Sequence, residues 1–281
     1  MNEEELQLTL SIVLFENKAT EIKELVSTIL KSTLKLKIFL IDNSKTDRLS
    51  ASLADLLSIS NIKYTFNDVN LGFGVAHNIA IRNAINAGSP YHLVINPDIA
   101  FQDSILEYLF KYMEDRPDIG LVMPKIIYPN GELQYSCKLI PTPSDLIFRR
   151  FLPSAFTKKR IEYFEMRSTG YDKEIEVPYL SGCFMFLRTE ALKKVGLFDE
   201  RFFMYPEDID LTRRINKEYK TIYNPAVSIV HEHAKGSYKT VRLLYIHITN
   251  MIKYFNKWGW IFDNERKKVN KRILSQLKQI N

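Results

Sequence analysis

The sequence predicts an α/β fold with a mainly parallel central sheet flanked by helices, followed by C-terminal helices. Short apolar runs alternate with helical patterns as far as Lys125. The runs are continuously apolar, which is typical of parallel strands buried on both faces. Polar clusters follow three of these runs, at Asp42, at Asn70–Gly74 and at Asp98. Ligands of parallel sheets bind at the carboxyl ends of the strands, so we expect the functional site there.

The first half of the chain contains five predicted strands and four predicted helices. The strands are the apolar runs Leu8–Leu14, Lys37–Ile41, Ile62–Phe66, Tyr91–Ile95 and Ile119–Met123. The helices lie between them, at Glu21–Lys31, Leu49–Leu57, Gly74–Ala87 and Ser104–Arg116. Apolar residues in each helix recur at helical spacing; in the first they are Ile22, Leu25, Val26 and Ile29. This alternation predicts helices packed on both faces of a parallel sheet.

The regular alternation ends after Lys125. Residues 128–178 are rich in proline, aromatic and basic residues, and we expect loops with short elements. Beyond them we expect a strand, two helices and two short strands, at Tyr179–Leu187, Thr189–Val195, Glu207–Tyr219, Thr221–Tyr223 and Val227–Val230. Two terminal helices follow, at Val241–Asn256 and Glu265–Ile280. We therefore predict one domain over residues 1–240 and a helical extension over residues 241–281.

The composition indicates an ordinary globular protein. Of its 281 residues, 46% are hydrophobic and 26% are charged. The two cysteines, Cys137 and Cys183, have no metal-ligand spacing, which favours a reducing, cytoplasmic compartment. The acidic N-terminus does not resemble a secretion signal, and the apolar runs are shorter than the ~20 residues that cross a bilayer. We expect a protein that is cytoplasmic or peripheral to the membrane.

The net charge of +6 is spread unevenly along the chain. Basic residues gather at Lys158–Arg160 and between Arg266 and Lys278. Solvated helix faces would explain them, and attraction to anionic lipid or to a phosphorylated acceptor is the alternative. We do not expect a nucleic-acid partner, because no nucleic-acid-binding module is visible.

Asn96-Pro97-Asp98 follows directly after a buried strand pattern. Asn-Pro-Asp is a good turn sequence, and a turn alone would explain it. The functional interpretation assigns Asp98 as an oxygen ligand of Mg²⁺ or Mn²⁺, with a diphosphate filling other coordination positions.

Glu207 and Asp208 open a helical pattern that also contains Asp210, Arg213 and Arg214. Acids at a helix start are favoured by the helix dipole, Asp210 can cap the helix, and Arg213 or Arg214 can pair with an acid one turn earlier. In the functional interpretation, Asp208 is a general base beside a hydroxyl nucleophile.

Two further segments carry polar residues with open interpretations. His231 and His233 follow an apolar strand and share one face; they are surface histidines, or His231 is a metal ligand with Ser237 and Lys239 near phosphate. The segment from Asn70 to Asn78 nearly matches the dinucleotide-binding fingerprint, but His77 replaces its third glycine. We interpret it as a glycine-rich turn that lets the backbone approach a ligand.

In this order, the motifs resemble those of the family 2 glycosyltransferases. The matching segments cover roughly residues 8–240: Leu10–Asn17, Ile41–Ser44, Asn70–Gly74, Asn96–Asp98, Ser181–Cys183, Phe198–Leu211 and His231. Within the family, the sequence is most similar to bacterial rhamnosyltransferases that build O-antigen and other surface polysaccharides. Phe198–Leu211 and the His-x-His-x-x-x-Ser-x-Lys stretch carry that similarity.

The resemblance implies a GT-A fold with a nucleotide-sugar half, about residues 1–125, and an acceptor half, about residues 126–240. It implies that a nucleotide sugar is bound by the side chains or backbone of Phe15, Asn17, Asp42, Asn70, Gly72, Asn78 and Asn96. Asp98 would bind the divalent metal. The usual Asp-x-Asp is here Asn96-Pro97-Asp98, so one carboxylate is missing, and His231, with His233 as the alternative, would supply another ligand.

The resemblance also implies inverting transfer, in which Asp208 deprotonates an acceptor hydroxyl and Glu207 orients hydroxyl groups. The implied donor is dTDP-β-L-rhamnose, which would give an α linkage on a growing, lipid-linked glycan. UDP-hexose, UDP-hexosamine or UDP-galactofuranose are alternative donors for the same chemistry. A catalytically silent nucleotide-sugar-binding scaffold is the alternative of another class.

The last predicted helix suggests a membrane contact. Ile273, Leu274, Leu277 and Ile280 lie within helical reach of one another among basic residues. They either pack on the domain or dock on the inner face of the cell membrane.

Overall fold

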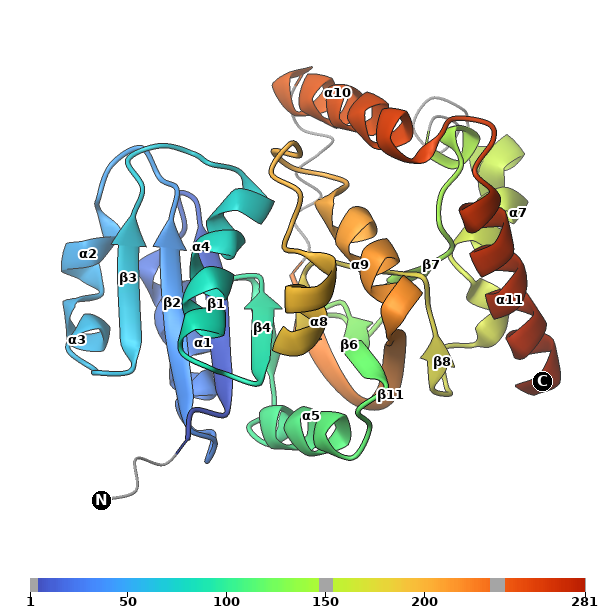
Figure 1. Cartoon of the computed structure of the whole chain (residues 1–281). Coiled ribbons are helices and arrows are strands. Elements are labelled where there is room, and N and C mark those ends of the chain that lie inside the picture. Colours follow the sequence, from blue (N-terminus) through green and yellow to red (C-terminus); the bar gives the residue numbers. More distant parts are fainter. Residues whose placement is uncertain (1–4, 147–153, 233–240, 281) are drawn as a thin grey trace.

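A computed structural model describes residues 5–146, 154–232 and 241–280 (Figure 1). Within these residues the centre of the fold is a nine-stranded sheet with the order β3-β2-β1-β4-β10-β6-β11-β5, and β8 beside β11. Its strands are β1 Leu8–Leu14, β2 Leu36–Asp42, β3 Ile62–Phe66, β4 Tyr91–Ile95, β5 Ile99–Phe101, β6 Ile119–Ile127, β8 Ile175–Glu176, β10 Phe184–Arg188 and β11 Lys220–His231. β7 Cys137–Lys138 pairs with β9 Tyr179–Leu180 in a second, small sheet.

The predicted parallel strands are confirmed in the first half of the sheet. β3, β2, β1 and β4 run parallel in adjacent positions, and their side chains are largely buried. The strand expected at Tyr179–Leu187 differs from the prediction. It breaks around Gly182 into β9 and β10, and β10 lies antiparallel between β4 and β6. This insertion joins the strands before and after residue 125 into one sheet.

Helices cover the sheet as the apolar periodicity predicts. They are α1 Ala19–Ile29, α2 Leu49–Ser52, α3 Ala54–Leu57, α4 Phe73–Asn86, α5 Ile105–Glu114, α8 Thr189–Val195 and α9 Glu207–Glu218. The helix expected at Leu49–Leu57 is divided at Leu53, where the backbone leaves the helical conformation. α7, at Ser154–Phe164, lies in the segment where we expected loops with short elements. Its residues show no clear apolar stripe from which a helix is readily predicted.

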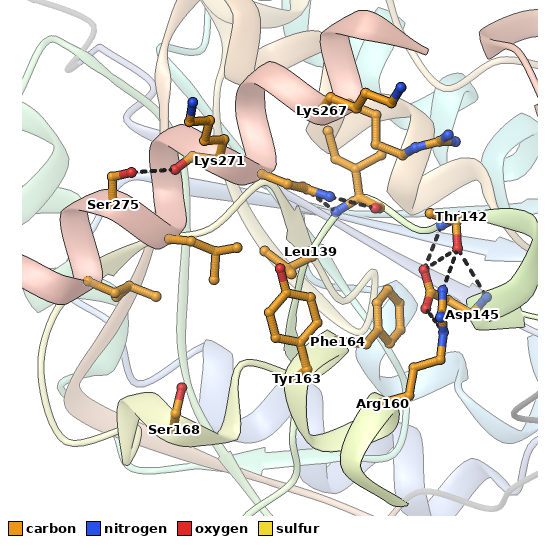
Figure 2. A pocket seen from close by; sticks show the side chains of 15 residues that line it. Leu139, Thr142, Asp145, Arg160, Tyr163, Phe164, Ser168, Lys267, Lys271 and Ser275 are labelled. Atoms are coloured by element: carbon orange, nitrogen blue, oxygen red, sulfur yellow. Dashed lines mark hydrogen bonds and ion pairs between the residues drawn. The ribbon is translucent and has the colours of Figure 1, made fainter. Parts of the chain in front are cut away.

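Two long helices end the chain, α10 Val241–Trp258 and α11 Asn264–Ile280. α10 lies across the end of α9, and α11 runs beside α7 (Figure 1). Ile273 of α11 is fully buried, and Leu274 and Leu277 line a cavity of about 820 Å³ between α11 and α7 (Figure 2). The apolar side of α11 is therefore directed at the protein, in agreement with the packing alternative. No helix within the described ranges has both the length and the apolar composition needed to cross a bilayer.

Candidate active site

A cavity of about 1230 Å³ opens at the carboxyl ends of β1, β2 and β4. Six of the residues predicted to bind the nucleotide sugar or the metal line it: Phe15, Asn17, Asn70, Gly72, Asn96 and Asp98. The cavity is also bordered by Phe203–Tyr205, from the loop before α9, and by Arg242 and Ile246, from α10. The strand ends thus bring together residues from distant parts of the sequence, as the predicted topology requires.

The polar wall of this cavity is held in place by hydrogen bonds within the protein. Asn43 donates from Nδ2 to the Gly72 carbonyl (3.1 Å) and to Asn70 Oδ1 (3.4 Å), and Gly72 N–H donates to Asn70 Oδ1 (2.9 Å). Gly72 has φ of +81°, and a Cβ there would overlap the carbonyl of Phe203. Only glycine therefore permits this close approach between the two loops.

Two residues expected to contact the nucleotide lie behind the cavity wall. Asp42 is fully buried and accepts hydrogen bonds from Tyr64 Oη (2.7 Å) and Ser44 N–H (2.8 Å). Asn78, also buried, exchanges two hydrogen bonds with the backbone of Phe198 (3.0 and 2.9 Å). Neither side chain is among the residues that line the cavity. Their polar atoms bond to Tyr64, Ser44 and Phe198, and their contact with a nucleotide stays a prediction.

Asp98 and His231 lie side by side. β5 and β11 pair antiparallel with Ile99 opposite His231, which brings His231 Nε2 within 3.4 Å of Asp98 Oδ1. On the other side of the ring, Nδ1 lies 3.0 Å from Gln134 Oε1, and Gln134 Nε2 donates to the His231 carbonyl (2.7 Å). Burial by itself lowers the pKa of His231, but its contacts with Asp98 and Cys183 raise that pKa to about 10.

This pair fits the donor set of a divalent cation. A carboxylate oxygen and an imidazole nitrogen are accepted ligands of Mn²⁺, and Gln134 orients the imidazole from behind. The described residues contain no group of three or more His, Cys, Asp or Glu side chains arranged for a metal. Substrate oxygens would therefore fill most of the coordination shell, as is common for Mg²⁺ bound with phosphates.

Asp208 stands at the start of α9. Its Oδ2 accepts a hydrogen bond from Gly182 N–H (3.2 Å), and its Oδ1 accepts one from Ile209 N–H (2.8 Å). A Cβ on Gly182 would lie 3.1 Å from Asp208 Cβ and 3.6 Å from the ring of Phe73. Gly182 thus lies next to both Asp208 and Phe73, and Phe73 lines the cavity. Burial raises the pKa of Asp208, while the positive charge of Lys138 and backbone hydrogen bonds oppose the rise.

Glu207 is nearly inaccessible to solvent, at 4% exposure. Burial and the adjacent charge of Asp208 raise its pKa well above the usual range of a glutamate. Within the described part of the chain, its Oε2 atom has no hydrogen-bond partner. The pKa values of both carboxyls are thus raised, that of Glu207 more strongly, because two adjacent buried carboxylates resist double ionisation.

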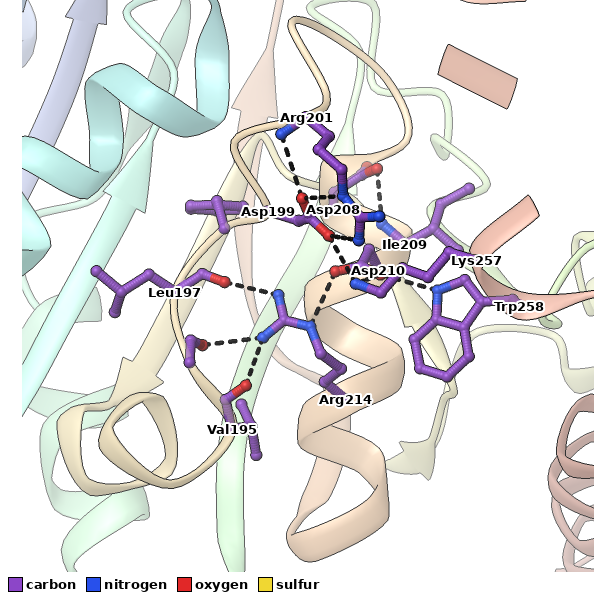
Figure 3. A network of polar contacts seen from close by, with 12 residues as sticks. Val195, Leu197, Asp199, Arg201, Asp208, Ile209, Asp210, Arg214, Lys257 and Trp258 are labelled. Atoms are coloured by element: carbon purple, nitrogen blue, oxygen red, sulfur yellow. Dashed lines mark hydrogen bonds and ion pairs between the residues drawn. The ribbon is translucent and has the colours of Figure 1, made fainter. Parts of the chain in front are cut away.

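The third acid of this helix, Asp210, has a structural role (Figure 3). It is fully buried and bonded to Arg214 Nε (2.9 Å), Lys257 Nζ (2.6 Å) and Trp258 Nε1 (2.8 Å). The Arg214 pair confirms the expected contact one turn along the helix. These contacts tie α9 to the end of α10 and commit the carboxylate of Asp210 to that junction.

The site predicted from the sequence and the site in the structure differ in several residues. Three predicted residues, His233, Ser237 and Lys239, lie outside the described residues. Asn43, Phe73, Gln134 and Arg242 belong to the site or support it but were not predicted as site residues. Asn43 had a signal, because it directly follows a predicted strand, next to Asp42. Gln134 had none, because it lies in a loop and reaches His231 through tertiary structure alone.

The family model for Glycosyl transferase family 2 matches residues 11–196. The chain belongs to this family. The matched region includes the second half of β1, the glycine-rich turn and Asp98, which contribute to the cavity, and Gly182, which bonds to Asp208. The protein is therefore a glycosyltransferase, which confirms the family predicted from the motifs.

Two curated family 2 relatives match most of the chain. An N-acetylglucosaminyl-diphospho-decaprenol L-rhamnosyltransferase of Mycobacterium tuberculosis is 28% identical over 231 residues, covering 76% of this chain and 72% of that protein. The rhamnosyltransferase WbbL of Escherichia coli K12 is 29% identical over 212 residues, covering 73% and 72%.

Solved structures of other glycosyltransferases share the architecture. GalNAc-T7, solved with UDP, GalNAc and Mn²⁺, superimposes with a TM-score of 0.60 at 16% identity, over 82% of this chain and 44% of that one. Residues 1–349 of TarS from S. aureus give a TM-score of 0.56 at 16% identity, over 87% and 66%. The chain thus spans less than half of GalNAc-T7. These similarities confirm the predicted GT-A fold.

Proposed function

We propose that this glycosyltransferase transfers L-rhamnose from dTDP-β-L-rhamnose, with inversion, to a hydroxyl of a growing lipid-linked glycan on the cytoplasmic side of the cell membrane. The arrangement of the two acids carries the proposal. Asp98, beside His231, lies on the wall of a cavity large enough for a nucleotide sugar, and Asp208 bonds to Gly182, which is next to Phe73 of the same cavity. The names of the two curated relatives support rhamnose as the donor sugar, and the name of the mycobacterial one supports a lipid-linked acceptor.

On the donor side, the protein binds and orients the nucleotide sugar. Phe15 is half exposed at the cavity rim and offers a flat apolar surface to a base. The amides of Asn43 and Asn70 and the backbone at Gly72 offer polar groups beside it. Asp98 and His231 are the residues that would hold Mg²⁺ or Mn²⁺. When bound, the cation supplies positive charge that stabilises the leaving diphosphate.

On the acceptor side, Asp208 acts as the general base. Its carboxylate takes the proton of the acceptor hydroxyl while that oxygen bonds to the anomeric carbon. The bond from this carbon to the diphosphate breaks on the opposite face, so a β-linked donor gives an α-linked product. Glu207, which keeps its proton, orients hydroxyl groups by donating a hydrogen bond. Burial of both carboxyls strengthens these interactions, because little water competes with them.

A donor panel tests the proposal. Thermal unfolding of the protein is followed with Mn²⁺ and dTDP-rhamnose, UDP-glucose, UDP-N-acetylglucosamine or UDP-galactofuranose, and transfer to a lipid-diphosphate-linked sugar is assayed with each. We expect dTDP-rhamnose to give the largest rise in Tm and the fastest transfer, with an α linkage in the product. Greater stabilisation and turnover with a UDP sugar would contradict the donor assignment. A β-linked rhamnoside would contradict inversion.

A further inference from the structure

The outer side of α10 carries an exposed apolar stripe. Val241, Tyr245, Ile248 and Ile252 recur at intervals of three or four residues, and therefore share one face of the helix. Val241 is 83% and Tyr245 69% exposed. The turn after the helix adds Trp260, Ile261 and Phe262, the last 86% exposed. Trp260 donates to Asn256 Oδ1 (2.8 Å), which holds its ring along the side of α10. We call these seven residues the α10 apolar face.

This face lies in the most basic part of the chain. Between residues 241 and 280 there are nine lysines and arginines and two acids, whereas residues 1–240 contain 30 basic and 31 acidic side chains. The whole net positive charge of the protein thus belongs to α10, α11 and the turn between them. Residues 241–262, which contain the apolar face, include no acid. Arg242 and Lys253 of α10 are exposed, as are Lys267 and Lys268 near the start of α11.

The inner side of α10 contacts the loop before α9 and forms part of the cavity wall. Asn250 Nδ2 donates to the Met204 carbonyl (2.9 Å), and Lys253 Nζ donates to the Arg201 carbonyl (2.9 Å). These contacts hold the loop that leads into Glu207 and Asp208. At the first turns of the helix, Arg242, Leu243 and Ile246 line the nucleotide-sugar cavity. A surface bound by the outer side of α10 would therefore lie beside the mouth of the cavity.

We propose that the α10 apolar face docks on the surface of an anionic lipid bilayer. Aromatic and branched aliphatic side chains would enter the headgroup region, and the neighbouring lysines and arginines would lie against anionic lipid, as in helices that bind in the plane of a membrane. Tyrosine and tryptophan are enriched at that depth. Docking would give the enzyme access to a lipid-linked acceptor, and this benefit rests on the proposed function. The docking itself does not depend on that function.

Vesicle sedimentation tests the docking without sugar or metal. The wild-type chain is spun with vesicles of phosphatidylcholine, alone or mixed with phosphatidylglycerol. We expect binding to the anionic vesicles, lowered by salt, and weak binding to the neutral ones. The double variant Tyr245→Ser, Ile248→Ser and the single variant Phe262→Ser should each lose roughly tenfold in partitioning, because they remove apolar area that would enter the lipid. None of the three residues lines the cavity.

A matched control and a second readout keep the test decisive. Tyr108→Ser removes an exposed tyrosine from α5, on the opposite side of the molecule from α10 (Figure 1), and should bind vesicles like the wild type. All variants are first checked for wild-type thermal unfolding. Equal sedimentation with both lipids, or wild-type binding by the α10 variants, would overturn the proposal. So would a wild-type dimer in analytical ultracentrifugation that these variants dissociate, because the face would then bind a second copy. Turnover of a soluble acceptor reports on the proposed function independently of vesicle binding.

Discussion

His231 Nε2 lies 3.4 Å from Asp98 Oδ1, because the antiparallel pairing of β5 with β11 sets the two residues next to each other. Gln134 holds the opposite side of the imidazole, with its Oε1 at 3.0 Å from Nδ1. Because Gln134 fixes the side of the ring that carries Nδ1, Nε2 is directed at the carboxylate of Asp98. The pairing thus places one carboxylate and one oriented imidazole together at the cavity wall.

Gln134→Leu should weaken metal-dependent donor binding without abolishing it. Loss of a group that orients a ligand typically lowers metal affinity by about 10- to 100-fold. Calorimetry with dTDP-rhamnose and a titration of Mn²⁺ would measure this loss, and Asp98→Ala should give a larger one. Asp115→Ala, an exposed acid at the end of α5, serves as the control. Donor affinity that is independent of Mn²⁺ in the wild type, or unchanged in Asp98→Ala, would rule out the metal role.

Asp208→Asn and Glu207→Gln should differ sharply in activity. The first variant removes the base, and we expect kcat to fall by about 100-fold or more while the donor still binds. The second replaces a carboxyl whose raised pKa favours the protonated form by a neutral amide of similar shape, so most of the activity should remain. Single-turnover transfer together with donor calorimetry would measure both effects. Near-normal turnover in Asp208→Asn would disprove the base assignment, and comparable losses in both variants would disprove the division of roles.

The pH dependence of transfer should respond to Lys138. In the proposed mechanism, transfer requires ionised Asp208, so the rate should fall as pH drops through the pKa of this carboxyl. Burial raises that pKa from its ordinary value of 3.8, and the positive charge of Lys138 lowers it. Lys138→Met removes the opposing charge, and the acidic limb of the kcat/KM profile should move to higher pH, with the plateau above it retained. Lys111→Met, on the exposed side of α5, should leave the limb in place. A shift to lower pH would contradict the electrostatic argument.

Much of the fold follows from local sequence patterns. The strands of the first half are apolar runs bounded by polar residues, and their burial on both faces makes the pattern clear. The sequence does not reveal that β10 runs antiparallel to its neighbours. An apolar run looks the same whether the strand is parallel or antiparallel. The place of β10 is decided by pairing with β4 and β6, and by the break at Gly182 that lets the chain approach Asp208. Local patterns do not record such pairings.

The site was predictable only in part for a related reason. Asp42 and Asn96 both follow a predicted strand, so the local sequence pattern is the same for both. In the structure, however, Asp42 bonds to Tyr64 and Asn96 lines the cavity. Whether a polar residue at a strand end faces the ligand depends on the neighbouring loop, which local patterns do not encode. Asp98 and Asp208 were singled out because Asp98 directly follows a strand pattern and Asp208 opens a helical one. Gln134 interrupts none, and its role comes from its contact with His231.

The junction between α9 and the C-terminal helices should depend on one buried ion pair. Arg213 binds Asp263 through two hydrogen bonds of 2.8 and 2.6 Å, both side chains are almost fully buried, and the guanidinium lies 3.9 Å from the centre of the Trp258 ring. Asp263→Ala leaves the arginine buried without its main partner, which should lower the free energy of unfolding by about 3 to 5 kcal/mol. Guanidinium denaturation would measure this loss. The double variant Arg213→Met, Asp263→Leu removes both charges and should recover much of the stability. A single variant as stable as the wild type, or a double variant no better than the single one, would show that the ion pair does not stabilise this junction.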